Sequence, residues 1–174
     1  MLECSDPVGI PRLQTARLRL REYRMADFDA FAAFWADAEA MKHLTPFSRR
    51  DSWRVFGCNT GGWLLQGVGW WAAELRASGA LVGNVGAFFR EGWPELELGW
   101  NTLREHWGQG YAREAARAVV DYAFEVRREP KLTVLVAPSN APSLRVAAHL
   151  GFVREGDAEL FGVKVERHGR VRET

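Results

Sequence analysis

The sequence has few cysteines and no long apolar run. Its two cysteines, Cys4 and Cys58, are too few and too unpatterned for a disulfide framework or a metal site. No stretch is long and apolar enough to span a bilayer. The N-terminus also lacks the charged start, apolar middle and small-residue cleavage site of a signal peptide. These absences predict a cytoplasmic protein with no membrane partner.

The sequence also has no large excess of positive or negative charge. The 23 Lys and Arg residues nearly balance the 22 Asp and Glu residues, so the formal net charge is +1 at pH 7. This balance argues against a protein that binds nucleic acid chiefly through phosphates. The chain also has no internal repeat, low-complexity tract or linker. Its 174 residues therefore predict one globular domain over residues 13–174, after a loose N-terminal segment over residues 1–12.

The hydrophobic periodicity switches between strand and helix patterns along the chain. Strands are expected over residues 17–23, 67–75, 81–89, 93–102, 132–137, 152–155 and 159–167, and helices around 28–35, 48–66, 109–127 and 140–151. The 48–66 segment contains Gly57, Gly61 and Gly62, each of which costs about 1 kcal/mol relative to Ala inside a helix. We therefore expect an imperfect helix there, broken or mobile in places. Together the elements predict an α+β domain built on a central mixed sheet.

A glycine pair in the middle of the chain points to anion binding. Gly108 and Gly110 stand one residue apart and lead into an alanine-rich run without proline, which predicts a tight loop that enters a helix. The first N–H groups of a helix lack intrahelical partners, and together with the helix dipole they attract a phosphate. The loop matches neither the dinucleotide fingerprint nor the P-loop pattern. Taken alone, the two glycines are also compatible with an ordinary turn.

Several short motifs surround this loop along the chain. They are Thr15-x-Arg17-Leu18-x-Leu20-Arg21, Gly83-Asn84-Val85-Gly86, Glu97-Leu98-Gly99-Trp100, Trp107 to Glu114, Asn140-x-x-Ser143 and Leu150-Gly151-Phe152. Through these motifs the chain resembles the GNAT acetyltransferase superfamily, and within it the RimJ/RimL type, from Leu13 to about Arg167. The resemblance implies a central mixed, mostly antiparallel, twisted sheet of about six to seven strands flanked by about four helices, with the fourth and fifth strands splayed to hold coenzyme A.

The resemblance also implies a cosubstrate and the residues that hold it. Acetyl-CoA would bring the acyl group, with no metal. Its pyrophosphate would bind the backbone N–H groups of Gly108 to Ala112, and its pantetheine arm would pair with backbone groups near Asn101 and Thr102. The binding residues implied in this way are Asn101, Thr102, Leu103, Trp107, Gly108, Gln109, Gly110, Tyr111, Ala112, Arg113, Asn140 and Ser143.

Two catalytic residues follow from the same resemblance. Glu97 would be the general base, acting through a water, and it shares a strand face with Gly99, which leaves room beside it. Burial in the sheet would raise the pKa of such a carboxylate and help it to accept a proton at neutral pH. Ser143 would donate to the coenzyme sulfur as a thiolate forms. The alternatives are a solvated strand carboxylate at Glu97, with Glu95 as a weaker rival base, and simple helix capping around Asn140.

The chain departs from the family pattern at two positions. Trp107 stands where the loop usually begins with Gln or Arg, and Ala147 stands where many members have a Tyr general acid. His106 and His149 are expected on the surface. Trp70, Trp71, Trp93 and Trp100 suggest aromatic walls near the acceptor channel, although some of them must be core.

We therefore expect an acetyl-CoA-dependent N-acetyltransferase in which a primary amine attacks the thioester directly. Its acceptor is expected to be a protein or peptide N-terminal α-amine, with a ribosomal protein as one possibility by analogy. Two alternatives stay open at the level of the sequence. One is a small-molecule acetylase for an aminoglycoside, polyamine or amino acid, and the other is a non-catalytic acyl-CoA-binding module. No direct nucleic-acid binding is expected, and the protein is expected to be a monomer or homodimer.

Overall fold

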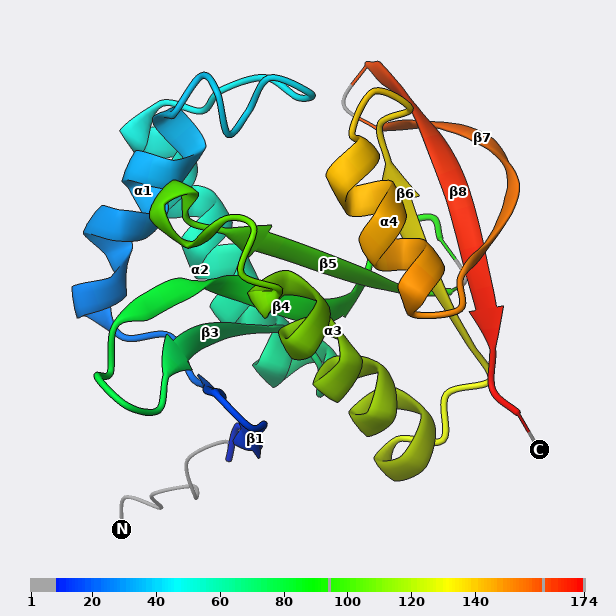
Figure 1. Cartoon of the computed structure of the whole chain (residues 1–174), viewed down its shortest axis with the longest axis horizontal. Helices are drawn as coiled ribbons and strands as arrows, with labels where there is room; N and C mark the ends of the chain where they lie inside the picture. Colours follow the sequence, from blue (N-terminus) through cyan, green and yellow to red (C-terminus); the bar gives the residue numbers. More distant parts are fainter. Residues whose placement is uncertain (1–8, 94, 161, 174) are drawn as a thin grey trace, which may run out of the picture.

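A computed structural model of the chain describes residues 9–93, 95–160 and 162–173. Its centre is an eight-stranded sheet with the order β1-β2-β3-β4-β5-β6-β8-β7 (Figure 1). Neighbouring strands are antiparallel except for β5 and β6, which are parallel. The strands are β1 (Leu13–Gln14), β2 (Leu18–Arg21), β3 (Trp70–Leu75), β4 (Leu81–Phe89), β5 (Leu96–Thr102), β6 (Lys131–Val136), β7 (Val153–Leu160) and β8 (Val163–Val171).

Helices cover both faces of the sheet. They are α1 (Phe28–Ala36), α2 (Arg49–Gln66), α3 (Tyr111–Asp121) and α4 (Ala141–His149), and a π-helical turn, Tyr122–Val126, continues α3. The buried face of α3 packs against alternate residues of β4 and β5, among them Val85 and Leu98. On the opposite face, α1 and α2 form an aromatic cluster around Phe31 and Phe56. The molecule therefore has a sheet between two helical layers (Figure 1).

This architecture confirms the expected α+β fold, with one more strand than predicted. The additional strand is β1, whose two residues pair with Leu20 and Arg19 in the middle of β2. We expected a loose segment over residues 1–12. Residues 1–8 of it lie outside the described residues, and residues 9–12 belong to no helix or strand. Within the described residues, no helix is long and apolar enough to cross a membrane.

The predicted break between the last two strands was wrong. We expected strands over 152–155 and about 159–167, with a gap between them. Instead β7 continues to Leu160, because Gly156 lies at a bulge in its pairing with β8, which begins at Val163. A bulge absorbs one extra residue without ending a strand, so this glycine does not mark a turn.

The glycine-rich segment forms a continuous helix. The Ser48 side chain caps the N-terminus of α2 by accepting from the N–H of Asp51. Phe56 and Trp63 then anchor the helix by burial. Gly62 has a packing role, because a Cβ at this position would lie 2.9 Å from the backbone oxygen of Val68. Tertiary packing therefore outweighs the weak helix propensity of the three glycines.

The parallel strands β5 and β6 pair only at their beginnings. The paired residues are Leu96 with Leu132 and Glu97 with Thr133, whereas β5 continues to Thr102 and β6 to Val136. Beyond Glu97 the two strands diverge, as the resemblance implies for the strands that hold coenzyme A. Past Glu97, β5 therefore pairs with no strand on its β6 side within the described residues, and the backbone oxygen of Thr102 accepts from Nε1 of Trp107 (2.7 Å).

Candidate active site

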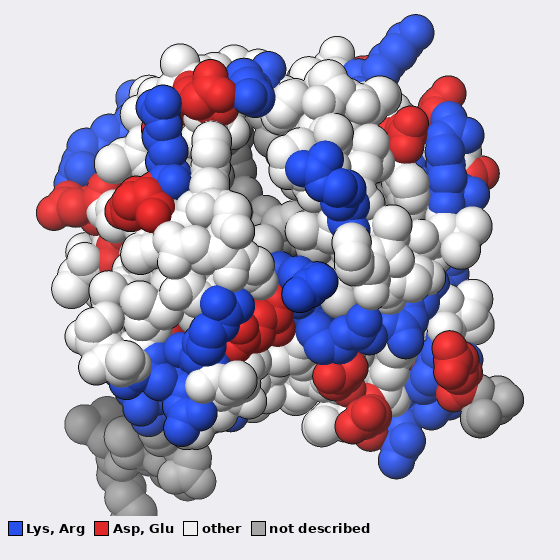
Figure 2. Space-filling view, in the orientation of Figure 1, with Lys and Arg blue, Asp and Glu red and all other residues white. Residues whose placement is uncertain are grey.

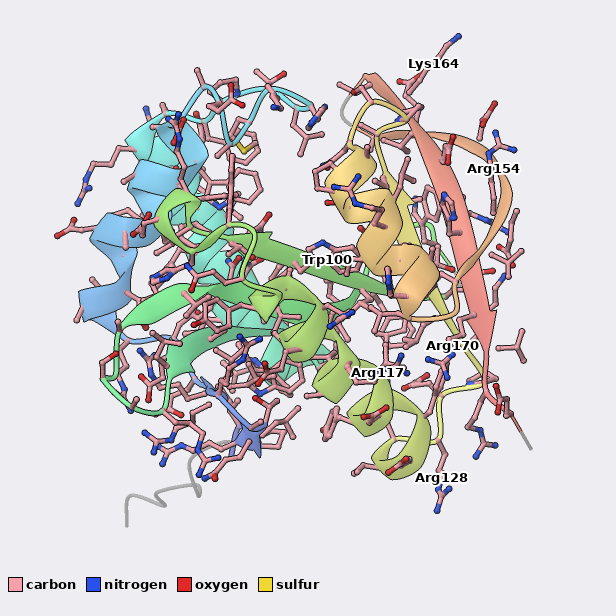
Figure 3. All side chains as sticks on the ribbon, in the orientation of Figure 1. Trp100, Arg117, Arg128, Arg154, Lys164 and Arg170 are labelled. Atoms are coloured by element: carbon pink, nitrogen blue, oxygen red, sulfur yellow. The ribbon has the colours of Figure 1, made fainter. Side chains whose placement is uncertain are left out.

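A cavity of about 610 Å³ lies at the end of β5 where the strands separate. One wall consists of β5, the glycine loop, the start of α3 and the exposed side of α4. The opposite wall is the connection between α1 and α2. Trp100 lines the cavity and lies on β5 in the gap toward α4 (Figure 3). The space-filling view shows the surface hollowed between the two halves of the molecule, with Lys and Arg side chains at the border (Figure 2).

The glycine loop presents free backbone N–H groups to this cavity. Gly108 (φ 74°) and Gly110 (φ 80°) both have left-handed backbone conformations that L-residues rarely adopt, and Gly110 is the N-cap of α3. The first backbone hydrogen bond of the helix runs from the N–H of Glu114 to the oxygen of Gly110. The N–H groups of the three preceding residues, Tyr111 to Arg113, therefore lack intrahelical acceptors. This geometry is suited to a phosphate anion.

Arg17 braces the loop from the N-terminal strand region. Its Nη1 donates to the backbone oxygen of Gln109 (3.0 Å), its Nε donates to Glu114 (2.7 Å), and its guanidinium lies 4.4 Å from the ring centre of Tyr111. Burial raises the pKa of Glu114, but hydrogen bonds from Thr15 and from Arg17 outweigh this effect and hold the pKa below its usual value. The sequence motif around Arg17 gave no sign of this bracing role.

Asn140 and Ser143 lie together at the start of α4. The side-chain oxygen of Asn140 accepts from the N–H of Ser143 (3.2 Å), so Asn140 caps the helix, and both residues also line the cavity. Ala147, one turn further along, is fully buried in the core. At the position where the family often has a Tyr, this chain therefore offers no side-chain proton donor.

Glu97 does not line the cavity. It is 8 % exposed, and both of its carboxylate oxygens accept from Arg90, at 2.8 and 3.0 Å. The room expected beside Gly99 is filled by the indole of Trp70, which lies across Gly86 and Gly99 so closely that a Cβ on either glycine would be 2.6 Å from a ring carbon. The indole thus separates Glu97 from the next row of side chains on the sheet. The role of Glu97 as a base stays a prediction.

The wall between α1 and α2 carries titratable groups that the sequence did not single out. Glu39, Lys42 and His43 line the cavity, and Glu39 pairs with Lys42 at 2.7 Å. His43 Nδ1 lies 2.8 Å from the Ser139 hydroxyl, which links this wall to the segment that precedes α4. Loss of water contact, and then the charge of Lys42, lower the pKa of His43, so the imidazole is neutral at pH 7.

The structure brings most of the expected binding residues to one cavity. Those that line it are Asn101, Thr102, Trp107, Gly108, Gly110, Tyr111, Ala112, Arg113, Asn140 and Ser143. Leu103 instead lines a smaller neighbouring cavity, and the Gln109 side chain folds back to donate to the Glu105 oxygen (3.2 Å). His106 and His149 border the large cavity; His149 is exposed as expected, and His106 is half-buried against Tyr111.

Comparison with known proteins finds acetyltransferases both by sequence and by structure. A family model described as an acetyltransferase (GNAT) domain matches residues 17–153. The uncharacterized protein YkkB of Bacillus subtilis (strain 168) is 34% identical over 146 residues, which cover 80% of this chain and 84% of that protein. An uncharacterized N-acetyltransferase, p20 of Bacillus licheniformis, is 28% identical over 148 residues, 83% of each chain. A solved acetyltransferase structure from Agrobacterium tumefaciens str. C58 has a TM-score of 0.86 at 32% identity, covering 98% of this chain and 99% of that one.

Proposed function

The chain belongs to the GNAT acetyltransferase family and is an N-acetyltransferase, and we propose that it transfers an acetyl group from acetyl-CoA to an N-terminal α-amine of a peptide or protein. The observation that supports the cosubstrate is the glycine loop at the start of α3, next to the strands that diverge after Glu97. This arrangement suits an acyl carrier with a pyrophosphate and a long arm that can pair with the free edge of β5.

In the proposed reaction the neutral amine nitrogen attacks the thioester carbonyl carbon. A C–N bond forms, the C–S bond breaks, and the electron pair leaves on sulfur. Ser143, whose side chain lines the cavity, donates a hydrogen bond to the developing thiolate. The proton of the attacking nitrogen passes to water in the open cavity. This assignment needs no residue at the position of Ala147.

The titratable groups of the cavity favour an acceptor whose amine is easily deprotonated. Glu97 lies outside the cavity lining and is held by Arg90. Within the cavity, Glu39 is paired with Lys42, and His43 is a weak base because of its lowered pKa. At pH 7 a lysine side chain, with a reference pKa of about 10.4, needs about 4.6 kcal/mol to become neutral. An α-amine with a pKa near 7.8 needs only about 1 kcal/mol. Among the described residues that line the cavity, the remaining candidate bases are histidines, so the α-amine is the better substrate.

The same charges disfavour polyamines and aminoglycosides. Such acceptors carry several ammonium groups, and each of these gains from a carboxylate nearby. The charged groups that line the cavity are Lys42, Arg113 and Arg145 against Glu39, and Glu39 is already paired. A peptide N-terminus, with a single ammonium group, fits this wall better. The expected RimJ/RimL type of acceptor agrees with this preference and is part of the proposal.

The acceptor class can be tested with two matched peptides. One has a free N-terminus and no lysine, and the other has the same sequence with a blocked N-terminus and one added lysine. We expect kcat/KM for the first to exceed that for the second by at least a hundredfold at pH 7, with the gap narrowing as the pH rises toward 10. Spermidine is assayed alongside the peptides as the small-molecule acceptor. Equal or better activity on the lysine peptide or on spermidine would overturn the proposal.

A further inference from the structure

A second, smaller cavity opens beside the first on the α1–α2 side of the sheet. Its volume is about 20 Å³, and it shares Phe34 and Asn101 with the large cavity. Aromatic rings of α1 and α2 form its roof, and Asn84 and Ala72 of the sheet form its floor. A space of this size holds one water-sized group. Because the glycine loop and α4 occupy the other wall of the large cavity, an acceptor approaches from this side.

A line of hydrogen bonds crosses the floor of the small cavity. Nδ2 of Asn101 donates to Oδ1 of Asn84 (2.8 Å), and Nδ2 of Asn84 donates to the hydroxyl of Tyr23 (2.7 Å). Asn59 of α2 also lies 3.5 Å from this hydroxyl. The line fixes the orientation of both amides. It leaves Oδ1 of Asn101 without a hydrogen-bond donor among the described residues, at the boundary between the two cavities.

The Tyr23 end of the line is rigid. The Tyr23 ring stacks on Phe56 with 4.8 Å between centres and 17° between planes, and it meets Phe31 edge to face at 5.9 Å. Burial raises the pKa of Tyr23, so its hydroxyl keeps its proton throughout the physiological range. Asp27 also lines the cavity, but both of its oxygens accept from Arg21, at 2.7 and 2.8 Å. The cavity therefore presents no unpaired charge within the described residues.

From this arrangement we infer that the small cavity is an acceptor subsite. It holds a short uncharged group on the carbon next to the reacting amine, while Oδ1 of Asn101 accepts a hydrogen bond from an N–H of the acceptor. Asn84 and Tyr23 are positioning residues, because they act by holding the Asn101 amide. The inference rests on the proposed α-amine acceptor and adds to it the selection of the neighbouring group.

The physical reason for this selection is space and solvation. A group larger than a few atoms would have to displace the rings of Phe31 or Phe56, which are packed against each other at 5.2 Å between centres. Overpacking of this kind costs about 1–3 kcal/mol. A charged group would enter an apolar cavity without a partner, which is costlier still.

The test uses peptides that differ only at the first residue: Gly, Ala, Ser, Leu, Phe or Asp. We expect kcat/KM to be at least tenfold higher for the three short residues than for the others. Tyr23→Phe removes only the hydroxyl that Asn84 contacts. It should raise KM for the short-residue peptides about fivefold while leaving KM for acetyl-CoA unchanged. Tyr122→Phe, the same change on the opposite face of the sheet, is the matched control and should alter neither constant.

A second variant tests the effect of enlarging the small cavity. Phe56→Leu shortens one roof residue, and it should improve kcat/KM for the Leu peptide relative to the Ala peptide by about fivefold. Two results would reject the subsite and leave the proposed function standing. The first is transfer to peptide α-amines at equal rates whatever the first residue. The second is a preference at the first residue that neither Tyr23→Phe nor Phe56→Leu changes. No transfer to any peptide α-amine would reject both.

Discussion

Arg90 holds both carboxylate oxygens of Glu97, at 2.8 and 3.0 Å, at the point where β5 and β6 begin to diverge. The carboxylate lies in the row of side chains next to Trp70, whose indole covers Gly99. An ion pair so enclosed stabilises the base of the splayed strands. It also occupies the oxygens that a catalytic base needs.

This relationship leads to a prediction for Glu97→Gln. We expect the variant to lose about 1–3 kcal/mol of unfolding free energy, because Arg90 loses its two charge-assisted hydrogen bonds to the carboxylate, while kcat changes less than threefold. Urea denaturation and steady-state kinetics measure the two effects. Glu91→Gln removes an exposed carboxylate from the segment before β5 and serves as the control. A hundredfold loss of kcat with stability preserved would instead establish Glu97 as the base that the sequence suggests.

A second prediction concerns the glycine loop. Gly110→Asp places a carboxylate beside the free N–H groups of α3, and it should weaken acetyl-CoA binding at least a hundredfold. Gly110→Ala introduces the same left-handed backbone strain without the charge, so it should weaken binding much less. Calorimetric titration of each folded variant with acetyl-CoA measures the difference. Unchanged affinity in Gly110→Asp would place the coenzyme elsewhere.

Ser143 should act on the transition state more than on binding. Ser143→Ala is expected to lower kcat about 10- to 100-fold, since the hydrogen bond to sulfur strengthens only as negative charge develops. The dissociation constant of acetyl-CoA should change less than threefold. Ser143→Thr retains a hydroxyl and should restore part of the rate. If kcat is unaltered in Ser143→Ala, the residue is only part of the capped helix start around Asn140.

The lowered pKa of Glu114 predicts a pH-dependent contribution to stability. The folded pKa lies below the reference value of about 4.3, so the carboxylate stabilises the fold fully above that pH, and the contribution is lost as the pH falls through the folded pKa. Compared with Glu114→Gln, the wild-type protein should be more stable by about 1 kcal/mol at pH 7. This difference should shrink as the pH falls below that reference value. A constant difference across the range, measured by urea denaturation, would contradict this account.

Local signals explain which parts of the fold and the site could be predicted. Gly108 and Gly110 indicate the anion loop because left-handed turns and helix starts depend on residues close in sequence. Asn140 indicates its helix cap for the same reason. The end of β7 was misplaced because a glycine inside a strand pattern, such as Gly156, can mark either a strand end or a bulge. Tertiary contacts decided between the two.

The wall of the large cavity between α1 and α2 could not be predicted from the local sequence pattern. His43 lies in a segment without helical or strand periodicity, and only the fold brings it to Ser139, 96 residues further along. Similarly, Trp70 covers Gly99, in the row next to Glu97, because β3, β4 and β5 lie in register, with glycines at the two crossing points. These relationships depend on strand pairing across the sheet. They therefore appear only when the chain is folded.

The two walls of the large cavity also come from different parts of the sequence. The glycine loop and α4 come from residues after 100, whereas Phe34, Glu39, Lys42 and His43 come from a short stretch before residue 50. Under the proposed roles of the two walls, substitutions in that early stretch would change acceptor choice while the coenzyme loop stays intact. Acceptor selection and coenzyme binding could then be altered separately within one chain.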